Sequence, residues 1–145
     1  MALLEKGEAA LSVGSGMAAI SVALLNALKA GDHLIAGDVI YGCTFAKIKK
    51  VLTNYGVEVS LVDTTNLEDV EKAIKPNTKA IYVETPANPL LKITDIKGAA
   101  EIAHKIGAKL IVDSTFASPY LQNPLELGAD VVVHSATKYL SGNGN

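Results

Sequence analysis

Short apolar runs alternate with longer segments of helical periodicity along the chain. Several runs are apolar at every position, as in 110–112 and 131–133. Such runs are typical of strands that are covered on both faces, as in a parallel sheet. The pattern predicts strands at Glu8–Val13, His33–Ala36, Val57–Val62, Lys79–Glu84, Lys109–Asp113 and Asp130–His134.

Polar and glycine residues between the strands predict where helices begin and end. Ser15 is a capping residue for a helix that reaches about Lys29 and is ended by Gly31. Further helices are predicted over Thr44–Tyr55 with Gly56 as the stop, from Asn66 to Pro76, and from a Thr94 cap to Gly107. Strands that alternate with helices indicate a doubly wound α/β fold. A mostly parallel sheet then lies between two helical layers, and ligands bind at the carboxyl ends of the strands.

Charge and composition exclude several kinds of partner. The net charge is −2 and the charges are scattered, so we expect neither nucleic acid nor a membrane surface as a partner. Cys43 is the only cysteine and cannot form an internal disulfide, which favours a reducing compartment and a cytoplasmic protein. The sequence predicts no metal site. The chain ends in a loop rich in Gly and Asn, and we expect it to be a piece of a longer protein.

The segment Gly14-Ser-Gly-Met17 opens the first long helix. Glycines let backbone N–H groups approach an anion, and the helix dipole favours a phosphate at this end. The same segment reads Gly-x-Gly-x-x-Ala, which matches a dinucleotide fingerprint, and Asp38 ends the next strand where a ribose-binding acid belongs. An ordinary helix start is the simpler alternative.

Asp113 and Lys138 follow two of the predicted strands. A carboxylate at the end of a strand could hold a protonated pyridine nitrogen, although a helix cap is an equal alternative. Lys138 could form a Schiff base with an aldehyde cofactor, with the hydroxyls of Ser135 and Thr137 suited to phosphate oxygens. Most lysines are solvated surface residues, and His134 is more often a hydrogen-bonded strand-end residue than a catalyst.

Two loops carry further candidates. Tyr41 could stack on a planar cofactor, or it could be a half-buried loop aromatic. Cys43 is also consistent with a small core residue. Asn88 lies in a loop bracketed by prolines and could bond the cofactor's ring oxygen or fix the turn.

The chain resembles the cysteine/methionine-metabolism family of pyridoxal 5'-phosphate (PLP) enzymes. That resemblance implies the aspartate-aminotransferase-like fold, fold type I of the PLP-dependent transferases. It spans essentially the whole chain. The motifs that carry it are Ser15-Gly-Met-Ala-Ala-Ile20, Asp38-Val-Ile-Tyr-Gly42, Glu84-Thr-Pro-Ala-Asn-Pro89, Val112-Asp-Ser-Thr-Phe-Ala117 and His134-Ser-Ala-Thr-Lys-Tyr-Leu-Ser-Gly142.

The resemblance also implies roles for individual residues. Lys138 is expected to hold the cofactor and to move protons, and Asp113 to pair with the pyridine nitrogen. Tyr41 is expected to stack on the ring and protonate the leaving group, with Cys43 as a further catalytic residue. The implied cofactor-binding residues are Gly16, Met17, Tyr41, Glu84, Asn88, Asp113, Ser135, Thr137 and Lys138.

Within the family, the segment 41–45 most resembles methionine γ-lyases, because other members commonly have Gly at the position of Cys43. The implied reaction is α,γ-elimination of L-methionine to methanethiol, 2-oxobutanoate and ammonia. The alternatives inside the family are a cystathionine γ-lyase, a cystathionine γ-synthase or an O-acetylhomoserine sulfhydrylase. The alternative outside it is a Rossmann-type NAD(P)-binding oxidoreductase domain.

The resemblance implies that residues 1–145 form part of a PLP-binding large domain, without the family's N-terminal arm and C-terminal domain. The parent enzyme is expected to be a homotetramer, a dimer of dimers. An arginine of the C-terminal domain is expected to bind the substrate carboxylate, so the chain alone is not expected to turn over substrate. Two positions depart from the family: Ser114 replaces Asn, and Asn143 replaces His or Gln.

Overall fold

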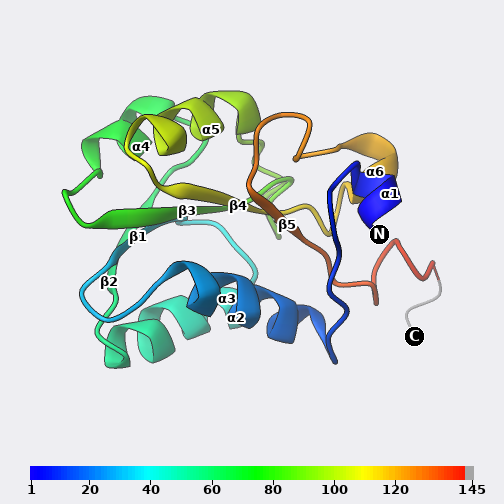
Figure 1. Cartoon of the computed structure of the whole chain (residues 1–145), viewed down its shortest axis with the longest axis horizontal. Helices are drawn as coiled ribbons and strands as arrows, with labels where there is room; N and C mark the ends of the chain where they lie inside the picture. Colours follow the sequence, from blue (N-terminus) through cyan, green and yellow to red (C-terminus); the bar gives the residue numbers. More distant parts are fainter. Residues whose placement is uncertain (143–145) are drawn as a thin grey trace.

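A five-stranded parallel sheet forms the centre of the protein (Figure 1). The computed structural model describes residues 1–142. The strands lie in the order β2-β1-β3-β4-β5, and every neighbouring pair is parallel. Their bounds are β1 His33–Gly37, β2 Glu58–Val62, β3 Thr78–Glu84, β4 Lys109–Asp113 and β5 Val131–Val133.

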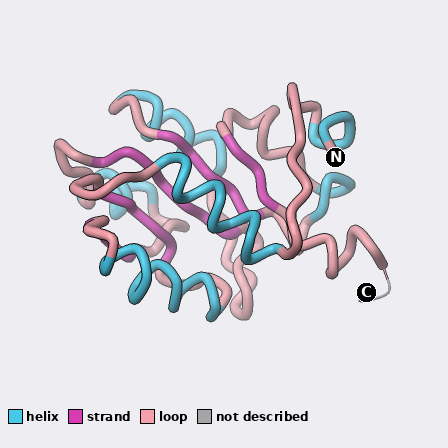
Figure 2. The backbone as a smooth tube through the Cα atoms, turned by 60° about the horizontal axis from the view of Figure 1, so that its bottom comes forward, coloured by secondary structure: helices cyan, strands magenta, loops and turns pink. Residues whose placement is uncertain are grey.

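Helices cover both faces of the sheet, as the alternation of elements predicts. In Figure 1, α2, α3 and the π-helical turn η1 lie below the sheet, and α4 and α5 lie above it. The short helices α1 and α6 contact each other at one end of the molecule (Figure 1), and Figure 2 shows helical turns beside the N-terminus at that end. The bounds are α1 Ala2–Glu5, α2 Gly16–Ala27, α3 Gly42–Ala46, η1 Lys47–Leu52, α4 Leu67–Lys72, α5 Ile96–Lys105 and α6 Ser118–Leu121.

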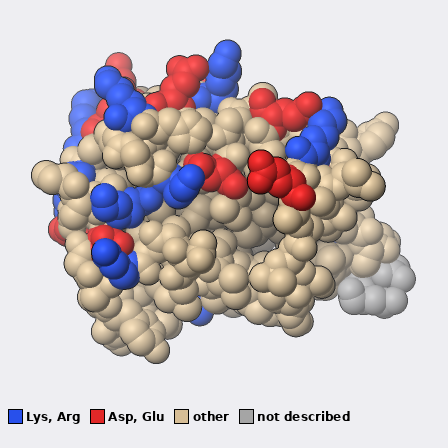
Figure 3. Space-filling view, viewed as in Figure 1, with Lys and Arg blue, Asp and Glu red and all other residues tan. Residues whose placement is uncertain are grey.

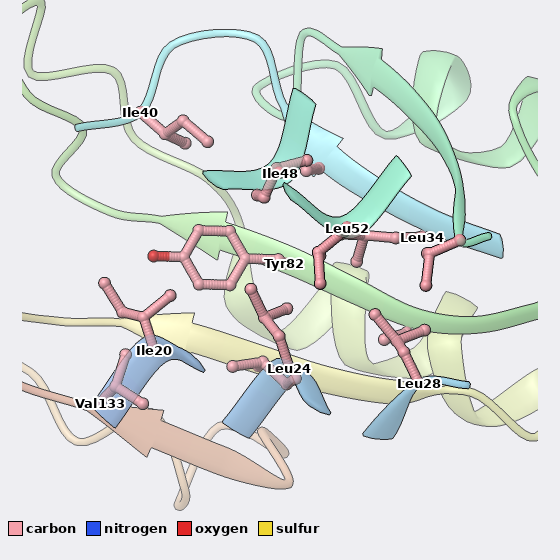
Figure 4. Close-up of a cluster of buried hydrophobic side chains, with 13 residues drawn as sticks. Ile20, Leu24, Leu28, Leu34, Ile40, Ile48, Leu52, Tyr82 and Val133 are labelled. Carbon is pink, nitrogen blue, oxygen red and sulfur yellow. The ribbon is translucent and has the colours of Figure 1, made fainter. Parts of the chain in front are cut away.

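Each face of the sheet has its own hydrophobic core. Successive side chains of a strand point to opposite faces, so Leu34 packs against α2 and η1 while Ile35 packs against α5. Tyr82 lies among leucines and isoleucines in the core on the α2 side (Figure 4). Burial on both faces explains why Leu110 and its neighbours in β4 are apolar without alternation, which confirms the predicted three-layer α/β fold.

The predicted strand at Glu8–Val13 is wrong. These residues form no strand in the structure and are largely exposed, with the Leu11 side chain 76% exposed. A strand needs a neighbouring strand to satisfy its backbone groups, and no neighbour pairs with this segment in the described sheet. The local sequence contains no information about that missing neighbour.

The predicted helices are present, with differences at their ends. Ser15 caps α2 as expected, since its Oγ accepts from the backbone N–H of Ala18 at 3.1 Å. Asp95 rather than Thr94 caps α5, because the Thr94 side chain is buried and bonded to Thr64. The helix that follows β1 contains the π-helical turn η1, which the sequence pattern did not predict.

Charged side chains gather over α4 and α5, and the face over α2 and α3 carries few of them (Figure 3). Among the described helices, none has both the length and the apolar character needed to cross a membrane. Within residues 1–142 no group of three or more His, Cys, Asp or Glu side chains is arranged to hold a metal ion.

Candidate active site

A cavity of about 740 Å³ lies at the carboxyl ends of the strands. This volume falls within the range of about 300–1,000 Å³ that is usual for small-ligand sites. Because the strands are parallel, the loops after β1, β3, β4 and β5 meet at this edge with the N-terminus of α2. All the predicted cofactor-binding residues line the cavity: Gly16, Met17, Tyr41, Glu84, Asn88, Asp113, Ser135, Thr137 and Lys138.

The N-terminus of α2 lies directly against the segment after β5. A Cβ atom added at Gly16 would lie 2.7 Å from Cβ of Ser135, closer than real side chains approach. Gly16 is therefore needed for space, and it brings free backbone N–H groups of the first helical turn beside a serine hydroxyl. The Met17 sulfur accepts a hydrogen bond from Oγ1 of Thr44 at 3.7 Å, which ties this turn to α3.

The Asp113 carboxylate is buried and bonded on both oxygens. Oδ1 accepts from the backbone N–H of Thr115 at 3.0 Å and from its hydroxyl at 2.6 Å. Oδ2 accepts from the Tyr82 phenol at 3.3 Å. Burial, together with the negative charge of Asp113, raises the pKa of Tyr82 well above its usual 10.0, so the phenol remains a donor. These bonds fix the orientation of the carboxylate at the end of β4.

Glu84, at the end of β3, joins two loops of the cavity. Its Oε2 accepts from the backbone N–H of Tyr41 at 2.7 Å, and Oε1 accepts from the backbone N–H of Asn88 at 2.8 Å. Burial raises the pKa of the Glu84 carboxyl, against the lowering effect of those two hydrogen bonds, and the charge of Asp113 raises it further. Glu84 therefore positions the backbone of Tyr41 and the backbone of Asn88.

Tyr41 is half exposed at the mouth of the cavity, with 44% of its surface accessible. The structure places Cys43 on α3, exposed and outside the cavity lining, but beside Tyr41. Interaction with the Cys43 thiol raises the pKa of the Tyr41 phenol.

Lys138 lies in a turn that follows β5. Its backbone N–H donates to the Ser135 carbonyl at 3.2 Å, and the N–H of Gly142 donates to the Lys138 carbonyl at 3.2 Å. Within residues 1–142 the Lys138 amine forms no hydrogen bond or ion pair with another side chain, and it reaches the cavity from an exposed position. A primary amine in this place is available for reaction with an aldehyde.

Some residues of the site were not predicted from the sequence. The Thr115 hydroxyl bonds Asp113 and also accepts from the backbone N–H of Ser135 at 2.9 Å. Phe116 and Tyr139 meet edge to face at the cavity, with ring centroids 6.2 Å apart. Thr115 could have been found from its place two residues after Asp113, whereas the ring pair joins segments that only the fold brings together.

Of the two positions that depart from the family pattern, the structure describes only Ser114. Ser114 is fully buried, and its Oγ accepts from the Gln122 side-chain amide at 3.0 Å. It does not line the cavity. Position 143 lies outside the described residues.

The residues present fit PLP. The close approach of Gly16 and Ser135 leaves an anion-binding surface of backbone N–H and hydroxyl donors, suited to a phosphate. A fixed, buried carboxylate at Asp113 suits a protonated ring nitrogen, and the amine of Lys138 suits an aldehyde. All of them line one cavity.

The dinucleotide alternative does not fit the structure. That fingerprint requires a strand directly before the first glycine, and residues 8–13 form no strand. Asp38, expected at a ribose, instead lies 3.6 Å from the Lys92 amine.

Comparisons with known proteins agree on one family. The family model for "Cys/Met metabolism PLP-dependent enzyme" matches residues 1–145. The chain is 58% identical to an L-methionine γ-lyase of Porphyromonas gingivalis and 56% identical to a cystathionine γ-lyase of Bacillus subtilis. These matches cover 100% and 98% of the chain and 37% of each relative. The chain therefore spans little more than a third of the length of the curated relatives it matches.

A solved structure shows the same fold. The crystal structure of metB from Corynebacterium glutamicum superimposes with a TM-score of 0.97 at 50% identity. The match covers 99% of this chain and 37% of that protein.

Proposed function

The chain belongs to the Cys/Met metabolism family of PLP-dependent enzymes, and on that basis we propose that it is the cofactor-holding part of a lyase of sulfur amino acids. The proposed reaction is α,γ-elimination of L-methionine to methanethiol, 2-oxobutanoate and ammonia. The observation that carries the proposal is the meeting of Lys138, Asp113 and the Gly16–Ser135 contact at one cavity. We also propose that the 145 residues belong to a longer cytoplasmic enzyme that assembles as a homotetramer.

Each group has a distinct task in this proposal. When bound, PLP withdraws electrons from the carbon atoms next to the substrate's amino group. Asp113, with both oxygens held, keeps a proton at the ring nitrogen. Lys138 provides the amine that holds the cofactor and then moves a proton at the α-carbon. The backbone N–H groups near Gly16 and the hydroxyls of Ser135 and Thr137 bind the phosphate.

Tyr41 is the proposed acid for the leaving thiolate. A tyrosine phenol, with an ordinary pKa of 10.0, keeps its proton at neutral pH, so Tyr41 can donate it to the departing sulfur; interaction with Cys43 raises that pKa further. A substrate amino acid enters beside Tyr41 because that side chain lies half exposed at the mouth of the cavity.

The attachment of PLP can be tested on the purified chain. We expect PLP to give absorbance near ~420 nm, from the chemistry of the cofactor, and to be fixed by borohydride. Mass spectrometry of a digest should find the phosphopyridoxyl group on Lys138. The variant Lys138→Ala should lose this label, whereas Lys97→Ala, on α5, should keep it. A label on any other residue in the unaltered chain would contradict the proposal.

The choice of substrate needs the longer enzyme. Its relatives include both methionine γ-lyases and a cystathionine γ-lyase of similar identity, so the two substrates should be compared directly. We expect methanethiol from methionine at a higher kcat/KM than cysteine from cystathionine. The variant Cys43→Gly should reverse or reduce that preference, because it removes the thiol beside Tyr41. Size measurements on the same protein would test the tetramer.

A further inference from the structure

A buried pair joins the first helix of the chain to the end of its last strand. The Nε2 atom of His134 lies 2.5 Å from Oε1 of Glu5, although the two residues are 129 positions apart. Their side chains are 6% and 3% exposed. The pair lies at the wall of the candidate active site, because His134 lines the cavity.

Each member of the pair is connected along the chain to one side of the proposed phosphate site. His134 immediately precedes Ser135, and residues 6–15 connect Glu5 to Gly16. Gly16 and Ser135 are the residues whose close contact brings the two sides together. Since residues 8–13 form no strand, no sheet hydrogen bond fixes this connection. The Glu5–His134 contact therefore joins the start of the connection 6–15 to the residue that precedes Ser135.

The pair is only partly hydrogen-bonded within the described residues. Within residues 1–142, Oε2 of Glu5 and Nδ1 of His134 are buried without a hydrogen-bond partner. Buried polar atoms left without a partner lower stability, and two apolar side chains would fill such a space at lower cost. The pair therefore contributes less to stability than a fully hydrogen-bonded pair would.

We propose that Glu5 and His134 are positioning residues that hold the two sides of the phosphate site, at Gly16 and Ser135, in contact. The inference rests on the proposed function, because it requires the phosphate of PLP to bind there. In this proposal the pair acts through Gly16 and Ser135. Its effect is on the spacing of the donors around the phosphate, and therefore on ligands that carry a phosphate.

The test compares PLP with pyridoxal, which has the same ring and aldehyde but no phosphate. Dissociation constants for both are measured on the purified protein and on the variants Glu5→Met, His134→Leu and the double variant. We expect PLP binding to weaken about tenfold in each variant, because loss of the pair separates the donors around the phosphate and one hydrogen bond to a charged group contributes about this much. Pyridoxal binding should change less than about twofold.

The control is Lys6→Met. Lys6 lies next to Glu5 and binds Glu126 at 2.6 Å, so this variant loosens the same segment without touching the pair. It should leave PLP binding unchanged. The double variant should weaken PLP binding no more than either single one, because the residues act as a unit.

The possible results separate the two proposals. Equal weakening of PLP and pyridoxal, an effect of Lys6→Met as large as that of Glu5→Met, or no weakening at all would overturn the positioning role. Failure of all three pair variants to fold would also overturn it, because the pair would then serve the fold in general. If the unaltered protein attaches no PLP at Lys138, the proposed function itself fails.

Discussion

Thr115 joins the carboxylate of Asp113 to the segment that carries Lys138. Its hydroxyl donates to Asp113 at 2.6 Å and accepts from the backbone N–H of Ser135 at 2.9 Å. One side chain therefore sets the spacing between the acid at the proposed ring position and the start of the lysine turn. The contact with Asp113 is local in sequence, whereas the contact with Ser135 joins residues 20 positions apart.

We predict that Thr115→Val weakens PLP binding about tenfold, because two hydrogen bonds are lost and the buried Asp113 loses a donor. Thr115→Ser keeps the hydroxyl and should bind PLP within about threefold of the unaltered protein. Titration followed by cofactor absorbance measures both. Equal binding by the Val and Ser variants would show that the hydroxyl has no such role.

His33 provides a residue-scale test of stability at the opposite end of the sheet. Its ring nitrogens lie 2.7 Å from Oγ1 of Thr78 and 2.9 Å from Oγ of Ser60, and the residue is fully buried. Burial lowers the pKa of His33 from 6.5, the charge of Lys75 lowers it further, and Glu58 opposes them. The folded protein therefore resists protonation of this ring.

The sign of the pH effect follows from that shift. Below pH 6.5 the unfolded chain takes up a proton at His33 that the folded protein does not, so the free energy of unfolding falls as the pH drops towards the folded-state pKa. We predict a smaller loss for His33→Gln between about pH 7.5 and about pH 5.5, measured by urea unfolding. An equal loss in both proteins would mean that other groups cause the pH dependence.

At the scale of elements, the start of α2 depends on a glycine for space and not for backbone freedom. Gly16→Ala places a methyl group 2.7 Å from Cβ of Ser135, so the helix and the loop after β5 must move apart. Gly14→Ala is a matched control, because a methyl group there meets no atom within 4 Å. We predict at least about a tenfold loss of PLP affinity for Gly16→Ala and none for Gly14→Ala. Equal effects would refute the close-contact explanation.

The elements that the sequence predicted correctly are those whose pattern is local. Strands β1, β3 and β4 are short, mostly apolar runs buried on both faces, and the cap of α2 depends on Ser15 and its neighbours alone. The errors have causes outside the segment. Glu8–Val13 has no partner strand within residues 1–142. The predicted cap Thr94 instead binds a distant residue, Thr64, and Asp95 caps α5.

The same distinction applies to the candidate site. The motif residues could be predicted because each follows a strand, and parallel strands bring their carboxyl ends to one edge. The Glu5–His134 pair and the Phe116–Tyr139 contact could not, because they join segments whose approach depends on the fold.

At the scale of the whole molecule, the charge of the cavity limits what the 145 residues can do. All the basic residues in the Lys+Arg count are lysines, and Lys138 is the only lysine among the described residues that line the cavity. Glu84 and Asp113 contribute two acidic side chains to the same lining. In the proposed function the Lys138 amine holds the cofactor, so no lysine or arginine of the lining remains for a substrate carboxylate.

We therefore predict that the purified 145-residue chain attaches PLP at Lys138 but releases no methanethiol from methionine. An amino-acid carboxylate needs a cationic partner, most effectively the two parallel N–H groups of an arginine, and these residues contain none. The longer enzyme, assayed alongside, should release methanethiol, and its Lys138→Ala variant should not. Methanethiol formed by the chain alone, at a rate that Lys138→Ala abolishes, would show that the carboxylate is bound without an arginine.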